Sequence, residues 1–306
     1  MPTVKNYLSL IKFSHTIFAM PFAVIGFFLG LQYHKKDKIF EDAFNYALRK
    51  GSYPPIERIA YIFTFVILCM ITARSAAMAF NRYLDRHFDA KNPRTAIREI
   101  PAGVITEKNA LYFTIVMSLL FVACTFFINR ICFYLSPVAL FVILFYSYTK
   151  RFTYLCHLVL GIGLSLAPIG AYLAVTGTFA FLPILFSVAV VCWVSGFDII
   201  FALQDEAFDT QHNLYSIPSV MGKAKALHVS EALHVIAAAA IIYAGIVGQF
   251  SYLYWVGVAV FSGMLIYQHS IIKHNNLSKV NIAFMTANGI ASVVFAVFVV
   301  GDMVLL

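Results

Sequence analysis

The residues of this sequence best suited to chemistry are carboxylates at helical spacing beside long apolar segments. Asn81, Asp85 and Asp89 recur at every fourth position at the end of one such segment. Residues four apart lie on one face of a helix, about 6 Å apart along its axis, so these side chains would form one slowly turning stripe. Carboxylates at the end of a membrane helix are costly unless they are paired or functional. The stripe therefore indicates either a cation site or a solvated helix end neutralised by Arg82 and Arg86.

A second acidic stretch closes a later apolar segment. Asp205 and Asp209 follow Asp198 by seven and eleven residues, and on a continuous helix the three side chains fall within about 40° of one another. Asp198 lies at a depth where an unpaired carboxylate is expensive. Two acidic stripes on the same side of a membrane predict a shared site. Mg²⁺ suits such a site, because it takes a few carboxylate ligands together with the phosphate oxygens of a substrate.

Basic residues accompany the acidic ones. Arg94 and Arg98 follow the first stripe, and Lys150 lies four residues after Tyr146 in another loop. Arginine can grip two oxygens of a phosphate, whereas lysine supplies a point charge. Acids for a metal and bases for oxyanions in one site predict a diphosphate substrate with an apolar tail. Alternatively, these bases only mark the side of the membrane on which they lie.

The composition places this site in a membrane. Of the 306 residues, 61% are hydrophobic and 12% are charged, about half the charged fraction of a soluble domain. We therefore predict an all-α integral membrane protein, a single polytopic domain over residues 1–306 with a central cavity. A span needs about 20 apolar residues. Nine segments qualify: 8–32, 59–84, 107–128, 131–149, 155–176, 180–203, 226–248, 252–270 and 280–304.

The distribution of charge predicts the orientation. Lysine and arginine residues in the N-terminal segment and in the loops after spans two, four, six and eight number fourteen, against seven on the opposite side. The positive-inside bias then places the N-terminus and both acidic stretches in the cytoplasm. The net charge of +8 has the same origin, and without a continuous basic face we expect no nucleic-acid partner. The one long polar segment, 33–58, is a solvated connector or contains a short amphipathic helix.

These motifs resemble the UbiA superfamily of intramembrane aromatic prenyltransferases, in its 4-hydroxybenzoate polyprenyltransferase-like branch. Three features carry the resemblance: Asn81, Asp85 and Asp89 followed by Arg94-Thr95 and Arg98; Asp198 with Asp205 and Asp209; and Tyr146 with Lys150. The similarity covers nearly the whole chain, including the nine spans and the order of the motifs. Two positions depart from the pattern of many 4-hydroxybenzoate enzymes, since Arg82 replaces an acid and Glu99 follows Arg98.

The resemblance implies a mechanism. Mg²⁺ held by Asp85, Asp89, Asp205 and Asp209 would bind the diphosphate of a polyprenyl donor, assisted by Arg94, Arg98 and Lys150. Loss of diphosphate would leave an allylic cation, sheltered by aromatic faces, for which Tyr146, Tyr148 and Phe197 are candidates unless they only pack. A phenolic ring would then attack, with Asp198 orienting the acceptor or taking its proton. Lys12 and His15 would meet an acceptor carboxylate or hydroxyl, or serve as an interfacial lysine and a packed histidine.

Several alternatives stay open at this stage. The acceptor is a 4-hydroxybenzoate-like aromatic carboxylate, a dihydroxynaphthoate of futalosine-type menaquinone synthesis or, less in keeping with the motifs, a haem or chlorin ring. From another class, a cation-coupled transporter would also use paired acids, although transporter sites tend to lie near the bilayer midplane on broken helices. The resemblance places the enzyme in a bacterial inner membrane, in contact with membrane lipid.

Overall fold

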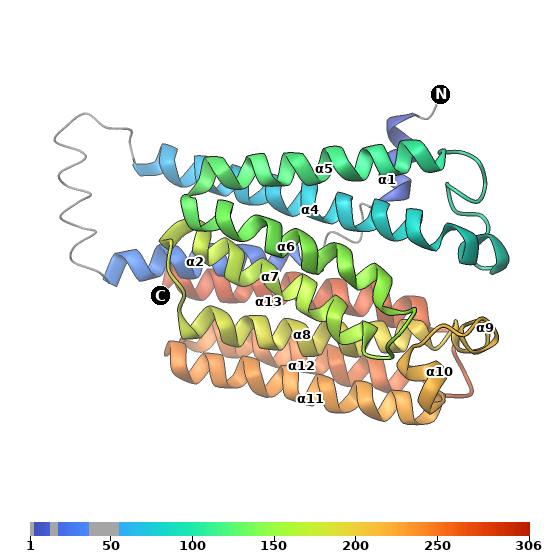
Figure 1. Cartoon of the computed structure of the whole chain (residues 1–306). Helices are drawn as coiled ribbons and strands as arrows, with labels where there is room; N and C mark the ends of the chain where they lie inside the picture. The colour runs from blue at the N-terminus through green and yellow to red at the C-terminus, as the bar shows by residue number, and fades with distance from the viewer. Residues whose placement is uncertain (1–2, 13–17, 37–54) are drawn as a thin grey trace.

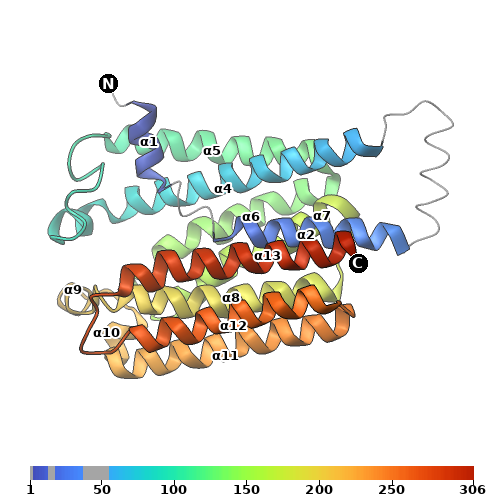
Figure 2. The ribbon, with the colours of Figure 1, turned by 180° about the vertical axis from the view of Figure 1, so that it is seen from behind.

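The computed structural model describes residues 3–12, 18–36 and 55–306, and in these ranges the chain is almost entirely helical (Figure 1). The helices are α1 (Val4–Leu10), α2 (Met20–Lys36), α4 (Pro55–Lys91), α5 (Glu107–Ile128), α6 (Arg130–Thr149), α7 (Cys156–Thr176), α8 (Phe181–Ala202), α9 (Glu206–Gln211), α10 (Ile217–Met221), α11 (Lys223–Gly248), α12 (Tyr252–Ile271) and α13 (Asn288–Leu305). A π-helical turn at Ile282–Ala287 leads into α13. The long helices run side by side in one bundle, as the opposite view also shows (Figure 2).

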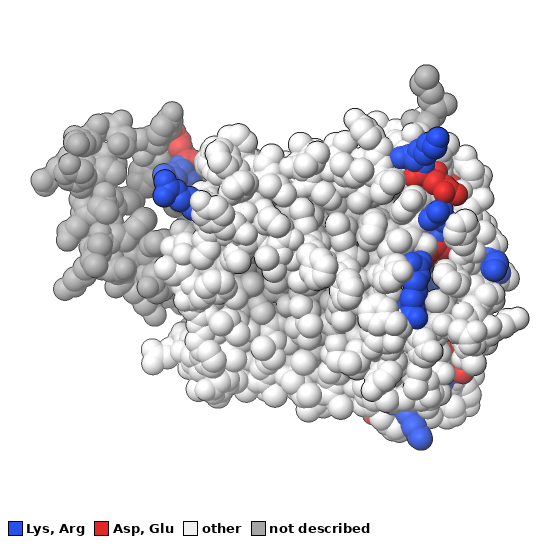
Figure 3. Space-filling view, viewed as in Figure 1, with Lys and Arg blue, Asp and Glu red and all other residues white. Residues whose placement is uncertain are grey.

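The bundle has the dimensions and surface of a membrane protein. In the described part of the chain, seven helices are long and apolar enough to cross a membrane: α4, α5, α6, α7, α8, α11 and the π-helical turn with α13. A shorter apolar helix covers Met20–Gln32. Figure 3 shows a broad band without charged side chains between two charged ends. The protein is therefore a multi-pass integral membrane protein of the predicted all-α class, and the predicted number of nine spans is approximate.

The first predicted span, 8–32, is not one continuous helix. Helix α1 ends at Leu10, and α2 begins at Met20. Between them Lys12 has a φ of 46°, and a right-handed helix cannot pass through a residue in this left-handed conformation. The polar segment predicted at 33–58 lies largely outside the described residues, which leave out 37–54.

Aromatic side chains fill the centre of the bundle. Phe22 of α2, Trp193 of α8, Phe261 of α12 and Phe295 of α13 are fully buried and contact one another with ring centroids 5.3–6.4 Å apart. Such aromatic pairs prefer tilted or edge-to-face arrangements. This cluster holds α8 between its neighbours and so fixes the helix that carries Asp198.

Small residues allow the helices to approach closely. A Cβ atom added to Gly26 of α2 would lie 2.0 Å from the carbonyl oxygen of Pro168 in α7, and one added to Gly161 of α7 would lie 2.5 Å from Ser195 Oγ in α8. In membranes, where apolar side chains gain little by leaving lipid, such close backbone contacts are a main source of helix association. Helix α7 is thereby clamped between α2 and α8.

The functional loops gather at one end of this bundle. The C-terminal ends of α4, α6 and α8, together with α9 and α10, lie at the same end, opposite the C-terminus of the chain (Figure 1). Thr106 caps the start of α5 by accepting a hydrogen bond from the Asn109 amide, so the chain re-enters the bundle soon after leaving α4. The loop between α4 and α5 is thus held near the ends of α6 and α8.

Candidate active site

A cavity of about 220 Å³ opens at the end of the bundle where these loops meet. Four elements supply its walls: the end of α4 with the following loop, the end of α6, the start of α7, and the end of α8 with α9. The cavity brings together ten of the predicted site residues: Asn81, Asp85, Asp89, Arg94, Arg98, Tyr146, Lys150, Asp198, Asp205 and Asp209. Residues separated by more than 120 positions in the sequence therefore share one space.

The first acidic stripe lies on an unbroken helix. Helix α4 extends over 37 residues to Lys91, beyond the predicted end at 84, so Asn81, Asp85 and Asp89 all project from helical turns. The Asn81 amide donates a hydrogen bond to Asp85 Oδ2 over 3.2 Å. Asp89 is only 6% exposed. The helix therefore presents the stripe to the cavity as its spacing predicted.

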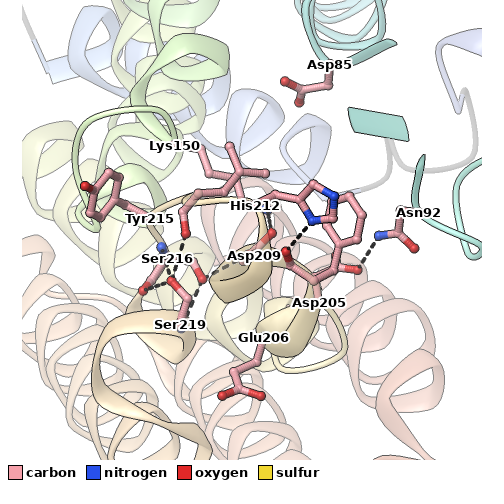
Figure 4. Close-up of polar contacts among 12 residues, drawn as sticks. Asp85, Asn92, Lys150, Asp205, Glu206, Asp209, His212, Tyr215, Ser216 and Ser219 are labelled. Atoms are coloured by element: carbon pink, nitrogen blue, oxygen red, sulfur yellow. Dashed lines mark hydrogen bonds and ion pairs between the residues drawn. The ribbon is translucent and has the colours of Figure 1, made fainter. Parts of the chain in front are cut away.

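The second stripe is not on a continuous helix, so the condition under which its three acids would share one face is not met. Helix α8 ends at Ala202, and α9 begins at Glu206. Asp205 lies in the turn between them, where it accepts hydrogen bonds from Arg94 Nε over 3.0 Å and from the Asn92 amide over 3.3 Å. These bonds reach across from the α4–α5 loop and stabilise the turn. Figure 4 shows Asp205 just before α9 and Asp209 on α9, with Asp85 on the facing side.

Each of the five carboxylates contacts at least one basic side chain. The ion pairs are Asp85 with Arg151 at 3.3 Å, Asp89 with Arg98 at 2.6 Å, Asp205 with Arg94, Asp209 with Lys150 at 2.8 Å, and Asp198 with His157 at 2.7 Å. Removing charges from water is costly unless each is paired. The cavity therefore holds a near-neutral set of charges, and all five acids line it together with Arg94, Arg98, Lys150 and His157.

The pair of Asp209 and Lys150 is the most enclosed part of this set outside the membrane spans. Asp209 is fully buried, and its Oδ2 also accepts a hydrogen bond from Ser216 Oγ over 3.1 Å. Burial raises the pKa of Asp209, and Lys150 opposes that rise. Burial by itself would lower the pKa of Lys150, but the charge and hydrogen bond of Asp209 outweigh it and raise the pKa. Lys150 is therefore a fixed positive charge at neutral pH.

The carboxylate oxygens are suitable ligands for a divalent metal, although in this structure they face basic side chains. In the described ranges no group of three or more His, Cys, Asp or Glu side chains is arranged to hold a metal ion. However, Asp89 Oδ2 is buried without a hydrogen bond to any described residue, and its nearest cation, Arg82 Nη1, is 4.0 Å away. A buried carboxylate oxygen without a donor is a ready ligand for a hard cation. Oxygen ligands on two facing walls suit Mg²⁺.

The aromatic lining differs in part from the prediction. Tyr146 lines the cavity, but Tyr148 and Phe197 do not. Phe197 is 3% exposed and packs in the central cluster, whereas Tyr148 is half exposed beneath Arg151. Phe201 takes part instead, with the Arg94 guanidinium 5.2 Å from its ring centroid. Phe197 and Phe201 are four apart on α8, so only the one nearer the helix end reaches the cavity.

The two N-terminal candidates are not part of this cavity as described. Lys12 is exposed in the turn after α1 and does not line the cavity. His15 lies outside the described residues. Sequence reasoning extended the first span through both positions, and the break after Leu10 removes the geometry on which that expectation depended.

Three residues that sequence reasoning left without a role are prominent here. Arg151 pairs with Asp85, and His157 pairs with Asp198. Arg74 lies seven residues before Asn81 on α4, and therefore on the same face about two turns deeper; its Nε is buried and has no hydrogen-bond partner in the described part of the chain. An intramembrane arginine is by itself a sign of function. His157 gave no such signal, because nothing in its spacing relates it to Asp198.

Comparison with known proteins agrees with this architecture. The UbiA prenyltransferase family matches residues 43–290. The 4-hydroxybenzoate octaprenyltransferase of Tolumonas auensis is 30% identical over 239 residues, which cover 76% of this chain and 83% of the relative. The enzyme of the same name from Nitrosomonas europaea is 32% identical over 235 residues, 77% and 80% of the two chains. The chain belongs to the UbiA prenyltransferase family.

Solved structures show the same fold. The apo structure of a UbiA homologue from Aeropyrum pernix K1 has a TM-score of 0.75 at 25% identity, over 95% of this chain and 97% of the other. The Archaeoglobus fulgidus homologue, solved with DMAPP and Mg²⁺, has a TM-score of 0.68 at 20% identity, over 98% and 100%. The protein is thus an integral membrane prenyltransferase of the 4-hydroxybenzoate polyprenyltransferase-like type, and the transporter alternative is set aside.

Proposed function

We propose that the protein catalyses the Mg²⁺-dependent transfer of a polyprenyl group from polyprenyl diphosphate to a ring carbon of a 4-hydroxybenzoate-like acceptor in quinone biosynthesis. Diphosphate is released in the reaction. The observation that carries the proposal is one shared cavity, in which carboxylates from α4 face those of α9 and the turn before it, among three cations from two loops. The names of the relatives support the substrate class.

The donor half of the reaction would use the acidic and basic side chains together. Asp85, Asp89, Asp205 and Asp209 would hold Mg²⁺, which when bound neutralises charge on the diphosphate and so favours its departure. Arg94, Arg98 and Lys150 would exchange their carboxylate partners for diphosphate oxygens. These donors are positioned before the charge develops, which is what makes electrostatic stabilisation effective.

The aromatic walls would serve the apolar part of the donor. Tyr146 and Phe201 lie where α6 and α8 approach the polar end of the cavity. The face of an aromatic ring attracts a cation, and more strongly where water is excluded. These two rings would stabilise the allylic cation that forms when the bond to diphosphate breaks, and would shield it from water.

The acceptor half of the reaction would use Arg74, which lies on the same face of α4 as Asn81 and about two turns deeper in the membrane. Arg74 is joined to no carboxylate among the described residues, so its guanidinium is available for an acceptor carboxylate. A charge-assisted hydrogen bond of this kind is about twice as strong as a neutral one. Asp198, which lines the cavity, would orient the phenolic ring or take its proton. An aromatic acceptor that carries a carboxylate and a hydroxyl group would suit Arg74 and Asp198 respectively.

The position in the membrane completes the proposal. The acidic and basic cluster lies at the end of the bundle that the positive-inside bias assigns to the cytoplasm, so we infer a cytoplasmic N-terminus in a bacterial inner membrane. Polyprenyl diphosphate would enter from the surrounding lipid. Residues 1–306 would act as one polytopic unit, because the cavity takes walls from α4 to α9.

The test is an assay in purified membranes with Mg²⁺, labelled polyprenyl diphosphate and two competing acceptors, 4-hydroxybenzoate and a dihydroxynaphthoate. We expect prenylated 4-hydroxybenzoate, lost with EDTA and with Asp85→Ala. Product from the naphthoate alone would instead assign the enzyme to menaquinone synthesis. That acceptor also carries a carboxylate that Arg74 could bind. Absence of metal-dependent turnover with either acceptor, in folded protein, would overturn the proposal.

A further inference from the structure

Asp198 differs from the other four cavity carboxylates in the nature of its basic partner. The others are paired with arginine or lysine, whereas Asp198 Oδ2 lies 2.7 Å from Nδ1 of His157. A guanidinium or ammonium group stays charged at neutral pH and favours an ionised carboxylate. An imidazole can be neutral at that pH. Asp198 is therefore the one acid of the set that can lack a permanent cationic partner.

The hydrogen bond between His157 and Asp198 has a defined direction. An ionised carboxylate only accepts hydrogen bonds, so the proton on Nδ1 is donated to Asp198 Oδ2 over 2.7 Å. The Ile217 backbone nitrogen lies 3.4 Å from Nε2, at the other side of the ring. Both ring nitrogens therefore have a partner, and His157 donates to one fixed oxygen of Asp198.

The histidine is also rigidly held. It is 3% exposed, and its carbonyl oxygen accepts a hydrogen bond from Ser195 Oγ of α8 over 3.0 Å. That bond ties the start of α7 to the helix that carries Asp198, one turn before it. The imidazole itself is held on the cavity wall by Asp198 at Nδ1 and by the Ile217 amide at Nε2, so the Ser195 bond to the backbone is not needed to orient the ring.

Asp198 keeps one oxygen for a ligand. Its side chain is 26% exposed and lines the cavity. Oδ2 is engaged by His157, whereas Oδ1 has no hydrogen bond to any residue in the described ranges. A carboxylate that is fixed through one oxygen and open at the other has the geometry of an oriented base.

We infer that His157 is a positioning residue that holds Asp198 as the base for the aromatic acceptor. This inference rests on the proposed function. As the ring carbon forms its bond to the prenyl C1, the bond from C1 to diphosphate has broken and its electron pair has left with the diphosphate. The C–H electron pair then restores the aromatic ring, and the proton passes to Asp198 Oδ1. His157 Nδ1–H stays bonded to Oδ2 throughout, so the carboxyl group does not rotate away.

The experiment compares variants in the proposed reaction with the acceptor deuterated at the ring carbons beside its hydroxyl. His157→Leu removes the hydrogen bond. His157→Gln keeps an amide donor for Asp198 and an acceptor for the Ile217 amide. Ser195→Ala is the packing control, because it changes the surroundings of His157 without touching Asp198. Product formation, diphosphate release and the KM of each substrate are measured for all of them.

We expect His157→Leu to lower kcat for product about 10- to 100-fold, within the range of a displaced general base, with the donor KM unchanged. Deprotonation then limits the rate, so a normal deuterium isotope effect appears that the wild type and Ser195→Ala lack. His157→Gln restores most of the rate and removes the isotope effect. This rescue separates positioning from packing.

The contrary results are equally clear. A folded His157→Leu variant with wild-type kcat and no isotope effect overturns the inference. The inference also fails if donor binding is weakened as much as product formation. If His157→Leu does not fold, Asp198→Asn must show the isotope effect with diphosphate release intact, and its failure to do so also overturns the inference. A wild-type enzyme that prenylates neither acceptor refutes the proposed function itself, a result distinct from indifferent variants of an active enzyme.

Discussion

Removing the ammonium group of Lys150 should destabilise the protein through the carboxylate that it leaves behind. Asp209 is fully buried, and Lys150 Nζ lies 2.8 Å from its Oδ1. The substitution Lys150→Met keeps an unbranched side chain as far as Cε and removes the charged ammonium group. Breaking a buried ion pair by removing one partner costs about 3–5 kcal/mol. Because the lysine side chain is 33% exposed, water can replace part of the lost interaction, and we expect the lower end, about 3 kcal/mol.

The loss should depend on pH. Folding raises the pKa of Asp209 through burial, so the folded state binds this proton more tightly than the unfolded state. Such a group adds most to stability below its unfolded pKa, and that contribution is lost as the pH rises through the folded pKa. Lys150 opposes this loss by favouring the ionised form. The Lys150→Met variant should therefore approach wild-type stability in acid and fall behind it toward neutral pH.

Reversible unfolding in mixed detergent micelles, measured across this pH range, tests the prediction. The double variant Lys150→Met/Asp209→Asn is the matched control, because it removes both charges. It should recover about 2 kcal/mol of the loss, a coupling energy typical of contacting groups. If the double variant is no more stable than Lys150→Met, or if the difference from wild type does not change with pH, the buried pair is not what stabilises this loop.

Three further outcomes follow from the same structure. Arg74→Gln should raise the acceptor KM at least about tenfold and leave the donor KM unchanged, since a hydrogen bond to a charged group contributes about 1.5–3 kcal/mol. Steady-state kinetics with each substrate varied in turn measure both constants, and an equal rise in both would contradict this prediction. Gly26→Ala should lower the free energy of unfolding by about 1–3 kcal/mol, because the added methyl group clashes with Pro168. Thermal unfolding checks this, with Gly170→Ala as the control: a methyl group there meets open space, so its stability should be unchanged or higher. EDTA should abolish product formation and excess Mg²⁺ restore it, and turnover that survives chelation would argue against a metal-dependent site.

The sequence predicted the fold class and much of the composition of the cavity, for physical reasons. Long apolar segments can bury their backbone polar groups in a membrane only as helices, so the spans follow from composition. The stripe of Asn81, Asp85 and Asp89 follows from helical spacing, because α4 continues without interruption as far as Lys91. Local rules were sufficient wherever the relevant contacts lie within one helix.

The errors arose where contacts between distant segments decide the backbone. The break between α8 and α9 depends on bonds to Asp205 from Asn92 and Arg94, which lie more than 100 residues away. The partners of the acids could not be read from spacing either: Arg86, expected beside the first stripe, pairs with Glu107 instead. The role of His157 depends on a contact between α7 and α8 that no periodicity encodes.

The pairing of acids with bases in the cavity has a consequence for how two ligands bind together. A metal ion that takes over a carboxylate releases an arginine or lysine, and a diphosphate that captures this cation releases a carboxylate. Either ligand alone would leave a charged side chain without its partner, whereas the two together keep every charge paired. The binding free energies are then coupled, and by thermodynamic linkage the coupling is reciprocal. Metal should tighten the donor by the same factor as donor tightens the metal, so the loaded cavity assembles as a cooperative unit at the membrane surface.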